Sequence, residues 1–145
     1  PPALTAFMRS HGDAVTRSDR YEPELNRFTP GDPRDTTSPA ASAVSLRRFV
    51  LGDALRPASR QQLADWLIDN ETGDACLRAG LGKRWRVGDK TGTNQTDAND
   101  IGIAWPTNGR APLIITAYLA ESTASSAVKE ATLAGVARLA ASLVG

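Results

Sequence analysis

Residues 84–119 read RWRVGDKTGTNQTDANDIGIAWPTNGRAPLIITAYL, and this stretch decides the fold. Apolar residues first alternate with arginines and then fill two runs rich in β-branched side chains, a pattern that indicates strands. The predicted strands span 84–93, 101–105 and 113–119. The Asn108-Gly109 pair between the last two is typical of a tight hairpin turn. We therefore predict an antiparallel meander of three strands.

Helical spacing of apolar residues precedes this meander and predicts a short helix over 3–10. Ser38-Pro39 has the order of a helix cap followed by proline, so we predict that a second helix begins there and ends near Gly52. The stripe that this helix is expected to bury consists of Val44, Leu46, Phe49, Val50 and Leu51.

A third helix is predicted over 58–69, with Leu63, Trp66 and Leu67 on one side. The Gly-rich residues 70–83 are predicted to be irregular. After the meander, an Ala-rich helix is expected from about Ala124 to the end of the chain.

Residues 11–39, between the first two helices, are polar, dense in charge and interrupted by four prolines. A long irregular segment inside a compact domain is more often a functional loop than a simple linker. We predict an ordered Ω-like loop over about 17–37. Helices followed by an antiparallel meander and a closing helix indicate the α+β class.

The composition is that of an ordinary globular chain of 145 residues, 41% hydrophobic and 23% charged, with a net charge of +1. So small a charge gives no reason to expect nucleic acid or an anionic membrane as a partner. No apolar run approaches the roughly 20 residues of a spanning helix, so we expect no membrane insertion. One His and one Cys exclude an internal disulfide and argue against zinc, and we expect neither a metal nor a cofactor.

The first group of residues with chemistry is Arg20-Tyr21-Glu22-Pro23-Glu24-Leu25-Asn26, inside the predicted loop. Proline favours an extended residue before it and is accepted at the start of a helix, so Glu22 and Asn26 are expected on one face of one turn. A carboxylate and an amide so placed can hold one water, whose proton Glu22 accepts. The alternative is a plain helix-terminal charge beside a solvated amide. Arg20 and Asp35 flank the loop and can close it with a bidentate ion pair.

The second group is Lys90-Thr91-Gly92-Thr93 at the end of the first predicted strand. Gly92 has no side chain, so a ligand can approach the backbone of what we expect to be an edge strand. The N–H of Thr93 can polarise an acyl carbonyl oxygen, Lys90 supplies positive charge, and Thr91 offers a hydroxyl to a ligand carboxylate. Alone, Lys-Thr-Gly is a weak match.

Together, these motifs resemble those of class A serine β-lactamases. The shared runs, in the order and approximate spacing of that family, are Arg-x-Glu-Pro-Glu-Leu-Asn, Asp-Pro-Arg-Asp-Thr-Thr-x-Pro and Gly-Asp-Lys-Thr-Gly-Thr. The resemblance covers nearly the whole chain and is to the C-terminal portion of the family. It implies a β-lactamase/transpeptidase-like fold, with 1–72 part of an all-helical domain and 73–145 part of an α/β domain.

The resemblance also implies roles for the loop residues. Glu22 would activate the water that hydrolyses a serine acyl-enzyme, and Asn26 would help to position it. The Glu22–Pro23 peptide bond would be cis, a state that is accessible before proline.

On the strand, the resemblance implies that Lys90 and Thr91 bind the substrate carboxylate side of the cleft, with Lys90 aiding proton movement. The backbone N–H of Thr93 would be one of two oxyanion donors. Cys76 departs from the pattern, because many relatives have in its neighbourhood an arginine that binds the substrate carboxylate, and a thiol cannot replace a guanidinium. We favour a small buried hydrophobe at this position.

The family's nucleophile lies in Ser-x-x-Lys and a second serine in Ser-Asp-Asn, both expected upstream of this chain. Ser126-Ala127-Val128-Lys129 has the first spacing but lies in the terminal helix, and Ser18-Asp19-Arg20 has arginine where asparagine is needed. We therefore predict that this chain alone does not hydrolyse β-lactams. The alternatives are a catalytically incomplete fragment or non-catalytic β-lactam-binding scaffold and, ranked last, a penicillin-binding transpeptidase.

The partners that follow from the resemblance are β-lactam antibiotics as substrates and the missing N-terminal portion as a complementing chain. The expected location is the bacterial periplasm or the cell exterior.

Overall fold

The computed structural model describes residues 1–144. In chain order the elements are α1 (Pro2–Ser10), η1 (Glu24–Asn26), α2 (Pro39–Leu46), η2 (Arg47–Leu51), α3 (Pro57–Ile68), α4 (Leu77–Leu81), β1 (Trp85–Thr93), β2 (Ala98–Pro106), β3 (Leu113–Leu119) and α5 (Ser126–Ser142). The three strands form one antiparallel sheet in the order β1-β2-β3. The predicted α+β fold, with its meander and closing helix, is confirmed.

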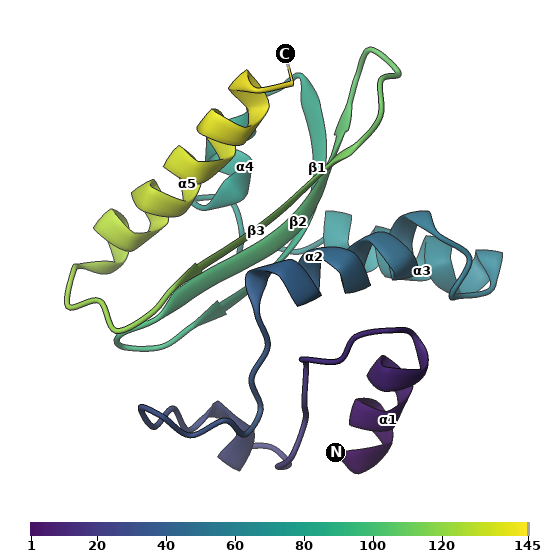
Figure 1. The fold of residues 1–145 in the computed structure, drawn as a ribbon. Helices are drawn as coiled ribbons and strands as arrows, with labels where there is room; N and C mark the ends of the chain where they lie inside the picture. The colour runs from purple at the N-terminus through teal and green to yellow at the C-terminus, as the bar shows by residue number, and fades with distance from the viewer. Residues whose placement is uncertain (145) are drawn as a thin grey trace.

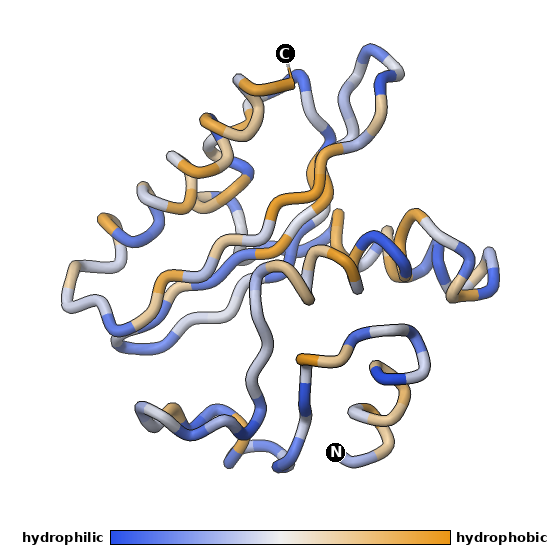
Figure 2. The backbone as a smooth tube through the Cα atoms, viewed as in Figure 1, coloured by the Kyte–Doolittle hydropathy of each residue, from blue (hydrophilic) through white to orange (hydrophobic). Residues whose placement is uncertain are grey.

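The sheet lies between two helical layers (Figure 1). α4 and α5 cover one face, α2 and α3 cover the other, and α1 and the loop over 11–38 lie beyond α2. The cluster under α4 and α5 contains Cys76, Leu77, Leu81, Ala98, Ala104, Ile115, Ala117, Leu133 and Ala137. The cluster under α2, η2 and α3 contains Leu46, Val50, Leu67 and Ile103. Figure 2 shows the most hydrophobic part of the strands in the half of the sheet nearer the 107–112 hairpin, which leaves the opposite end more polar.

Residues 70–83 are not irregular throughout, because α4 occupies Leu77–Leu81. Leu77 is 1% exposed, and its N–H donates to Asp100 Oδ2 at 3.0 Å. The helix is therefore stabilised by a partner 23 residues away, which a local Gly-rich pattern does not reveal. β2 likewise begins at Ala98 and not at 101, because its polar first residues are paired on both sides in the middle of the sheet.

The predicted buried stripes were partly wrong. Leu46, Val50 and Leu67 are buried, but Val44 is 52% and Trp66 66% exposed. Leu51 is also exposed, with 38% of its surface accessible. A helix in a single covering layer buries one narrow face, and residues two positions apart point to nearly opposite sides of it. Apolar identity alone therefore overstates how much of such a helix is covered.

The start of α2 follows the predicted pattern. The Ser38 side chain accepts a hydrogen bond from the N–H of Ala41, and Pro39 is the first helical residue. The helix is fixed to the sheet where the Ser42 and Tyr118 hydroxyl groups hydrogen-bond at 2.7 Å. This contact sets the position from which the preceding loop departs.

α5 packs closely on α4 through Gly80, whose missing side chain leaves room for the backbone of α5. A Cβ at Gly80 would lie 2.1 Å from the carbonyl oxygen of Ala134 and 2.7 Å from the Cβ of Ala137. Across residues 1–144, no helix combines the length and the apolar character needed to cross a membrane.

Gly80→Ala should therefore lower the free energy of unfolding by about 1–3 kcal/mol, because the helices must separate. The matched control is Gly135→Ala on α5, where the nearest atom to the new Cβ is 3.7 Å away. That variant should be more stable by about 0.5–1 kcal/mol, since alanine is the better helix former. Thermal unfolding followed by circular dichroism checks both, and equal effects would contradict the packing described.

Candidate functional site

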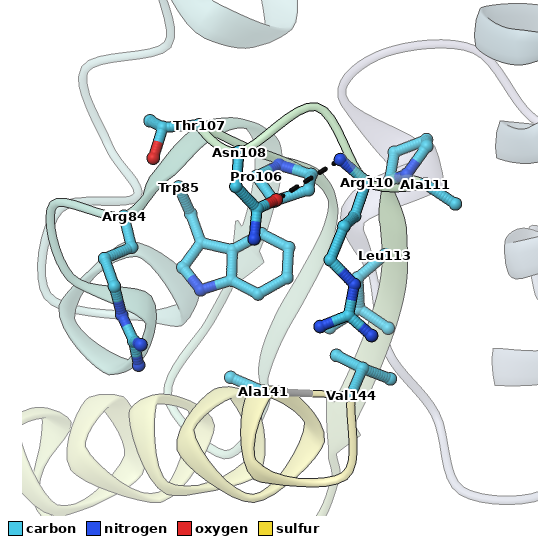
Figure 3. Close-up of a pocket in the computed structure, with 11 residues that line it drawn as sticks. Arg84, Trp85, Pro106, Thr107, Asn108, Arg110, Ala111, Leu113, Ala141 and Val144 are labelled. Atoms are coloured by element: carbon cyan, nitrogen blue, oxygen red, sulfur yellow. Dashed lines mark hydrogen bonds between the residues drawn. The ribbon is translucent and has the colours of Figure 1, made fainter.

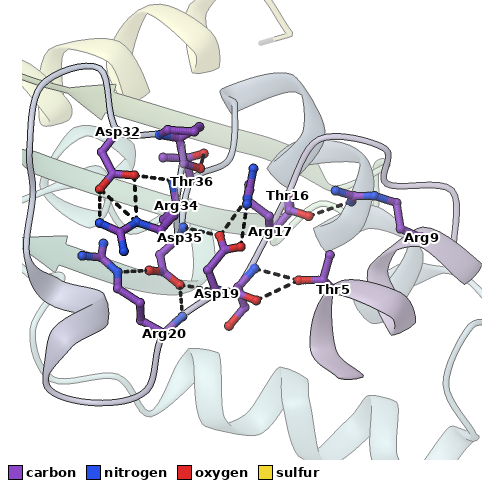
Figure 4. Close-up of polar contacts among 12 residues, drawn as sticks. Thr5, Arg9, Thr16, Arg17, Asp19, Arg20, Asp32, Arg34, Asp35 and Thr36 are labelled. Carbon is purple, nitrogen blue, oxygen red and sulfur yellow. Dashed lines mark hydrogen bonds and ion pairs between the residues drawn. The ribbon is translucent and has the colours of Figure 1, made fainter. Parts of the chain in front are cut away.

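Polar contacts order the loop over 11–38, which has little apolar surface to bury (Figure 4). Arg20 Nε lies 2.5 Å from Asp35 Oδ2. Asp35 Oδ1 accepts hydrogen bonds from the N–H groups of Asp19, at 2.6 Å, and Arg20, at 3.0 Å. Asp19 in turn pairs with Arg17 at 2.6 Å. The Asp35 carboxylate thus joins residues 19–20 to the later part of the loop.

The predicted ion pair between Arg20 and Asp35 is present but differs in detail. It is partly buried, with side-chain exposures of 16% and 8%. Only Nε reaches the carboxylate, because Nη2 donates to the carbonyl of Arg27 at 3.1 Å. Burial acts to raise the pKa of Asp35, but the hydrogen bonds from Arg20 and Asp19 outweigh it and lower the pKa to about 2. Asp35 is therefore charged throughout the neutral range.

Glu22 and Asn26 are brought together by the turn that the sequence predicts. The Glu22–Pro23 bond is cis, and η1 follows directly. Asn26 Nδ2 donates to Glu22 Oε2 at 2.5 Å, and both side chains are exposed. The amide thus contacts the carboxylate directly, whereas we expected a water between them. An exposed carboxylate held in one orientation can accept a proton from a nearby water.

Lys90, Thr91, Gly92 and Thr93 lie at the end of β1, which is an edge strand of the described sheet. A Cβ at Gly92 would meet nothing within 4 Å, so the backbone there is open to a ligand. Lys90 Nζ donates to the carbonyl of Thr91 at 2.6 Å. The Thr91 hydroxyl lies 2.5 Å from that of Thr72, in the loop before α4.

One cavity of about 440 Å³ joins the loop to the strand. Arg20, Asn26 and Asp35 line it from the loop, and Gly92 and Thr93 line it from β1. Glu22, Lys90 and Thr91 are not part of this lining. The structure therefore brings the two predicted groups of residues to one place, with Asn26 and Thr93 facing the same space.

Sequence reasoning missed a set of buried charges beside this site. Asp89 and Asp100 are 0% exposed, and Arg78 Nη2 lies 2.5 Å from Asp89 Oδ1. Lys129 is 4% exposed and donates to the carbonyl of Gln95 at 2.7 Å. An aspartate within a strand, such as Asp89 in the run before Lys90, was the available signal.

Cys76 is buried, as we favoured. It is 3% exposed and belongs to the apolar cluster under α4 and α5. Burial and then the charges of Asp100, Glu130 and Asp89 raise the pKa of its thiol to about 11. This side chain therefore offers no charge to a ligand.

A second hollow, of about 370 Å³, lies near the 107–112 hairpin and the end of α5 (Figure 3). Trp85 forms its base, with Arg84 and Arg110 at its sides. None of the predicted site residues lines it, so it is separate from the candidate site.

Comparison with known proteins assigns a family. A model described as "Beta-lactamase enzyme family" matches residues 2–144. Beta-lactamase L2 of Stenotrophomonas maltophilia is 64% identical over 146 aligned residues, which cover 100% of this chain and 48% of that protein. The carbapenem-hydrolyzing β-lactamase KPC of Klebsiella oxytoca is 49% identical, with 97% of this chain and 48% of the relative covered.

Solved structures agree. The crystal structure of L2 complexed with relebactam matches with a TM-score of 0.95 at 64% identity, covering 100% of this chain and 54% of that one. A β-lactamase from Xanthomonas campestris pv. campestris matches with a TM-score of 0.95 at 57% identity, covering 100% and 55%. The chain spans about half the length of the curated relatives it matches. The chain belongs to the class A β-lactamase family, and it corresponds to the C-terminal portion of its members.

Proposed function

We propose that the residues of this chain form part of an enzyme that hydrolyses the β-lactam amide bond through a serine acyl-enzyme. The observation that carries the proposal is the single cavity lined by both Asn26 and Thr93, beside the hydrogen-bonded pair of Glu22 and Asn26. Hydrolysis of an ester needs a base for water and donors for the carbonyl oxygen on one substrate. The loop supplies the first and the end of β1 the second.

Glu22 is the base for deacylation in this proposal. Its carboxylate is exposed and accepts the Asn26 amide on one oxygen, which leaves the other for a water molecule. The ion pair between Arg20 and Asp35 stabilises the loop and so holds the turn that carries Glu22 and Asn26 beside the cavity. Water adds to the acyl carbonyl carbon and transfers a proton to Glu22. The acyl C–O bond to the serine then breaks, and the proton passes from Glu22 to the serine oxygen.

The end of β1 binds the substrate. Lys90 and Thr91 receive its carboxylate, with Lys90 supplying charge and aiding proton movement. The open backbone at Gly92 lets the acyl group approach, and the N–H of Thr93 donates to the carbonyl oxygen as its charge develops.

The nucleophile comes from residues outside these 145. The chain's only Ser-x-x-Lys spacing is Ser126–Lys129, and its lysine is bound to the carbonyl of Gln95. We propose that an N-terminal portion, in the same or a complementing chain, supplies the serine. It would cover exposed apolar residues of α5, such as Val136 and Leu139. Residues 1–72 would then belong to a helical domain and 73–145 to an α/β domain, in a protein of the bacterial periplasm or cell exterior.

The first test joins this chain to the part of Stenotrophomonas maltophilia β-lactamase L2 that precedes the matched residues, here called the joined protein. We expect a fluorescent penicillin to leave the isolated chain unlabelled. We expect the joined protein to hydrolyse a chromogenic cephalosporin such as nitrocefin. Stable covalent labelling of the isolated chain would refute the assignment of the nucleophile. A folded joined protein without hydrolysis would refute the proposed activity.

The second test concerns Glu22. In the joined protein, Glu22→Gln should lower turnover by about 100- to 10,000-fold, because water loses its base. Acylation should persist, so the acyl-enzyme should accumulate and be visible by intact mass spectrometry. Glu24→Gln is the matched control, since Glu24 is also exposed on the same turn, and it should turn over normally. Equal losses in both variants would remove Glu22 from the mechanism.

The third test concerns the loop. Asp35→Asn removes the charge that accepts Arg20 and two backbone N–H groups, so the position of Glu22 should become less defined. Deacylation should slow by more than acylation. Asp32→Asn is the control, because among residues 1–144 the Asp32 side chain pairs only with Arg34, which is 52% exposed. If stopped-flow kinetics show both variants slowed alike, the bridging role of Asp35 is wrong.

A further inference from the structure

Two carboxyl groups lie side by side inside the molecule, next to the proposed substrate-binding end of β1. Asp89 and Asp100 are both 0% exposed. In the strand register, Asp89 is opposite Gly102 and Asp100 is opposite Thr91. The two aspartates are therefore diagonal neighbours on one face of the sheet. That face is the one covered by α4, because Arg78 contacts Asp89 and the N–H of Leu77 contacts Asp100.

Each of the two carboxyl groups has one oxygen that accepts no hydrogen bond from the described residues that surround it. Within residues 1–144, Asp89 Oδ2 and Asp100 Oδ1 are buried and have no hydrogen-bond partner. Because the two aspartates are diagonal neighbours across β1 and β2, a hydrogen bond between them becomes possible once Asp100 carries a proton, and this bond acts to raise the pKa of Asp100. Two charged oxygens so placed would repel in a medium that screens them poorly. One proton between them removes the second charge and satisfies both oxygens, one as donor and one as acceptor.

The surroundings decide which residue carries the proton. Asp89 Oδ1 accepts from Nε of Arg78 at 2.6 Å and from Nη2 at 2.5 Å, so its charge is compensated. In the described part of the chain, Asp100 accepts only the N–H of Leu77, at 3.0 Å. Burial raises the pKa of Asp100 to about 7, and the charge and hydrogen bond of Asp89 act in the same direction. Asp100 is therefore the donor and Asp89 the acceptor.

The other charged groups nearby do not change this assignment. Arg78 also lies 3.9 Å from Asp74, which is 82% exposed and so well hydrated. The buried thiol of Cys76 is neutral, and Glu130 on α5 adds negative charge on the same side. Both features disfavour a second ionised carboxylate at Asp100.

We propose that Asp89 and Asp100 share one proton and that this protonated pair positions Lys90 and Thr91 for substrate, by holding the loop over 69–76 and α4 against β1. The positioning role rests on the proposed function. Asp89 directly precedes Lys90 in the strand. A Cβ at Gly73 would lie 1.5 Å from Asp89 Oδ2, so the loop backbone is seated on this carboxyl group. One residue earlier, the Thr72 hydroxyl contacts that of Thr91 at 2.5 Å.

Loss of the shared proton at higher pH should lower the stability of the folded protein. The folded protein binds this proton more tightly than the unfolded chain, whose aspartate has the ordinary pKa of 3.8. The stability that the pair contributes is complete below that value and is lost as the pH rises through the raised pKa. Between these limits, the equilibrium constant for unfolding should rise about tenfold for each pH unit because of this one group. Above them, repulsion should release the loop from Thr91.

The test compares the joined protein with its Asp100→Asn variant. The new amide can donate to Asp89 Oδ2 and accept from the N–H of Leu77, so it imitates the protonated acid at every pH. The variant should lose the infrared band of a buried protonated carboxyl group and the pH-dependent fall in stability. It should still bind substrate. In the parent, KM for a penicillin should rise above neutral pH while kcat changes less, and in the variant KM should stay level.

Asp97→Asn is the matched control. Asp97 is 8% exposed, and although burial acts to raise its pKa, hydrogen bonds from Glu121, Asn94 and Thr96 outweigh that effect and lower it. This variant should keep the infrared band. If the parent has no such band, or if Asp100→Asn keeps the parent's pH-dependent fall in stability, the shared proton is refuted.

The two proposals can fail separately. Infrared spectra and unfolding need no hydrolysis, so an inactive joined protein with the expected band would overturn the activity and its positioning role, and leave the shared proton standing. An active protein whose KM has the same pH dependence in parent and variant would refute the positioning role alone.

Discussion

Arg78 on α4 and Asp89 on β1 form an ion pair of 2.5 Å in which the carboxylate is fully buried. The same guanidinium donates to the carbonyl oxygens of Leu67 and Ile68 at the end of α3, each at 3.0 Å. One side chain thus joins the helical layers on the two faces of the sheet around the edge formed by β1. Removing either partner of this buried ion pair would leave the other charge uncompensated and would strongly destabilise the folded protein. The position of the next residue, Lys90, depends on this ion pair.

The alternation of side chains along β1 places the proposed substrate-binding residue Lys90 directly after the buried Asp89. Successive side chains point to opposite faces, so the strand that buries Asp89 presents Lys90 on its other side. Two residues later, Gly92 leaves the backbone open. Asp89 and the binding groups are therefore adjacent in sequence, and neither requires a loop to bring it into place. The more polar end of the sheet, visible in Figure 2, is where these groups emerge.

The sequence predicted what depends on local pattern. Strand alternation, the cap at Ser38 and the turn at Pro23 are short-range features, and the structure contains each of them. It did not predict what depends on distant partners. α4 needs Asp100 to accept its first N–H, and the exposure of Trp66 depends on which side of α3 meets the sheet. The meeting of Asn26 and Thr93 at one cavity could be expected from family resemblance, but not from either motif alone.

The two halves of the site use carboxyl groups in opposite protonation states. Asp35 in the loop accepts two backbone N–H groups and Arg20, so its pKa is lowered to about 2, and the stability it contributes is lost only as the pH falls through that range. Asp100, in β2 beside the end of β1, is more deeply buried and accepts fewer hydrogen bonds, and its pKa is raised. Near neutral pH the loop is therefore insensitive to protonation, whereas the strand is not. Because the loop is proposed to serve deacylation and the strand to bind substrate, a rise in pH should weaken binding before it affects the hydrolytic step.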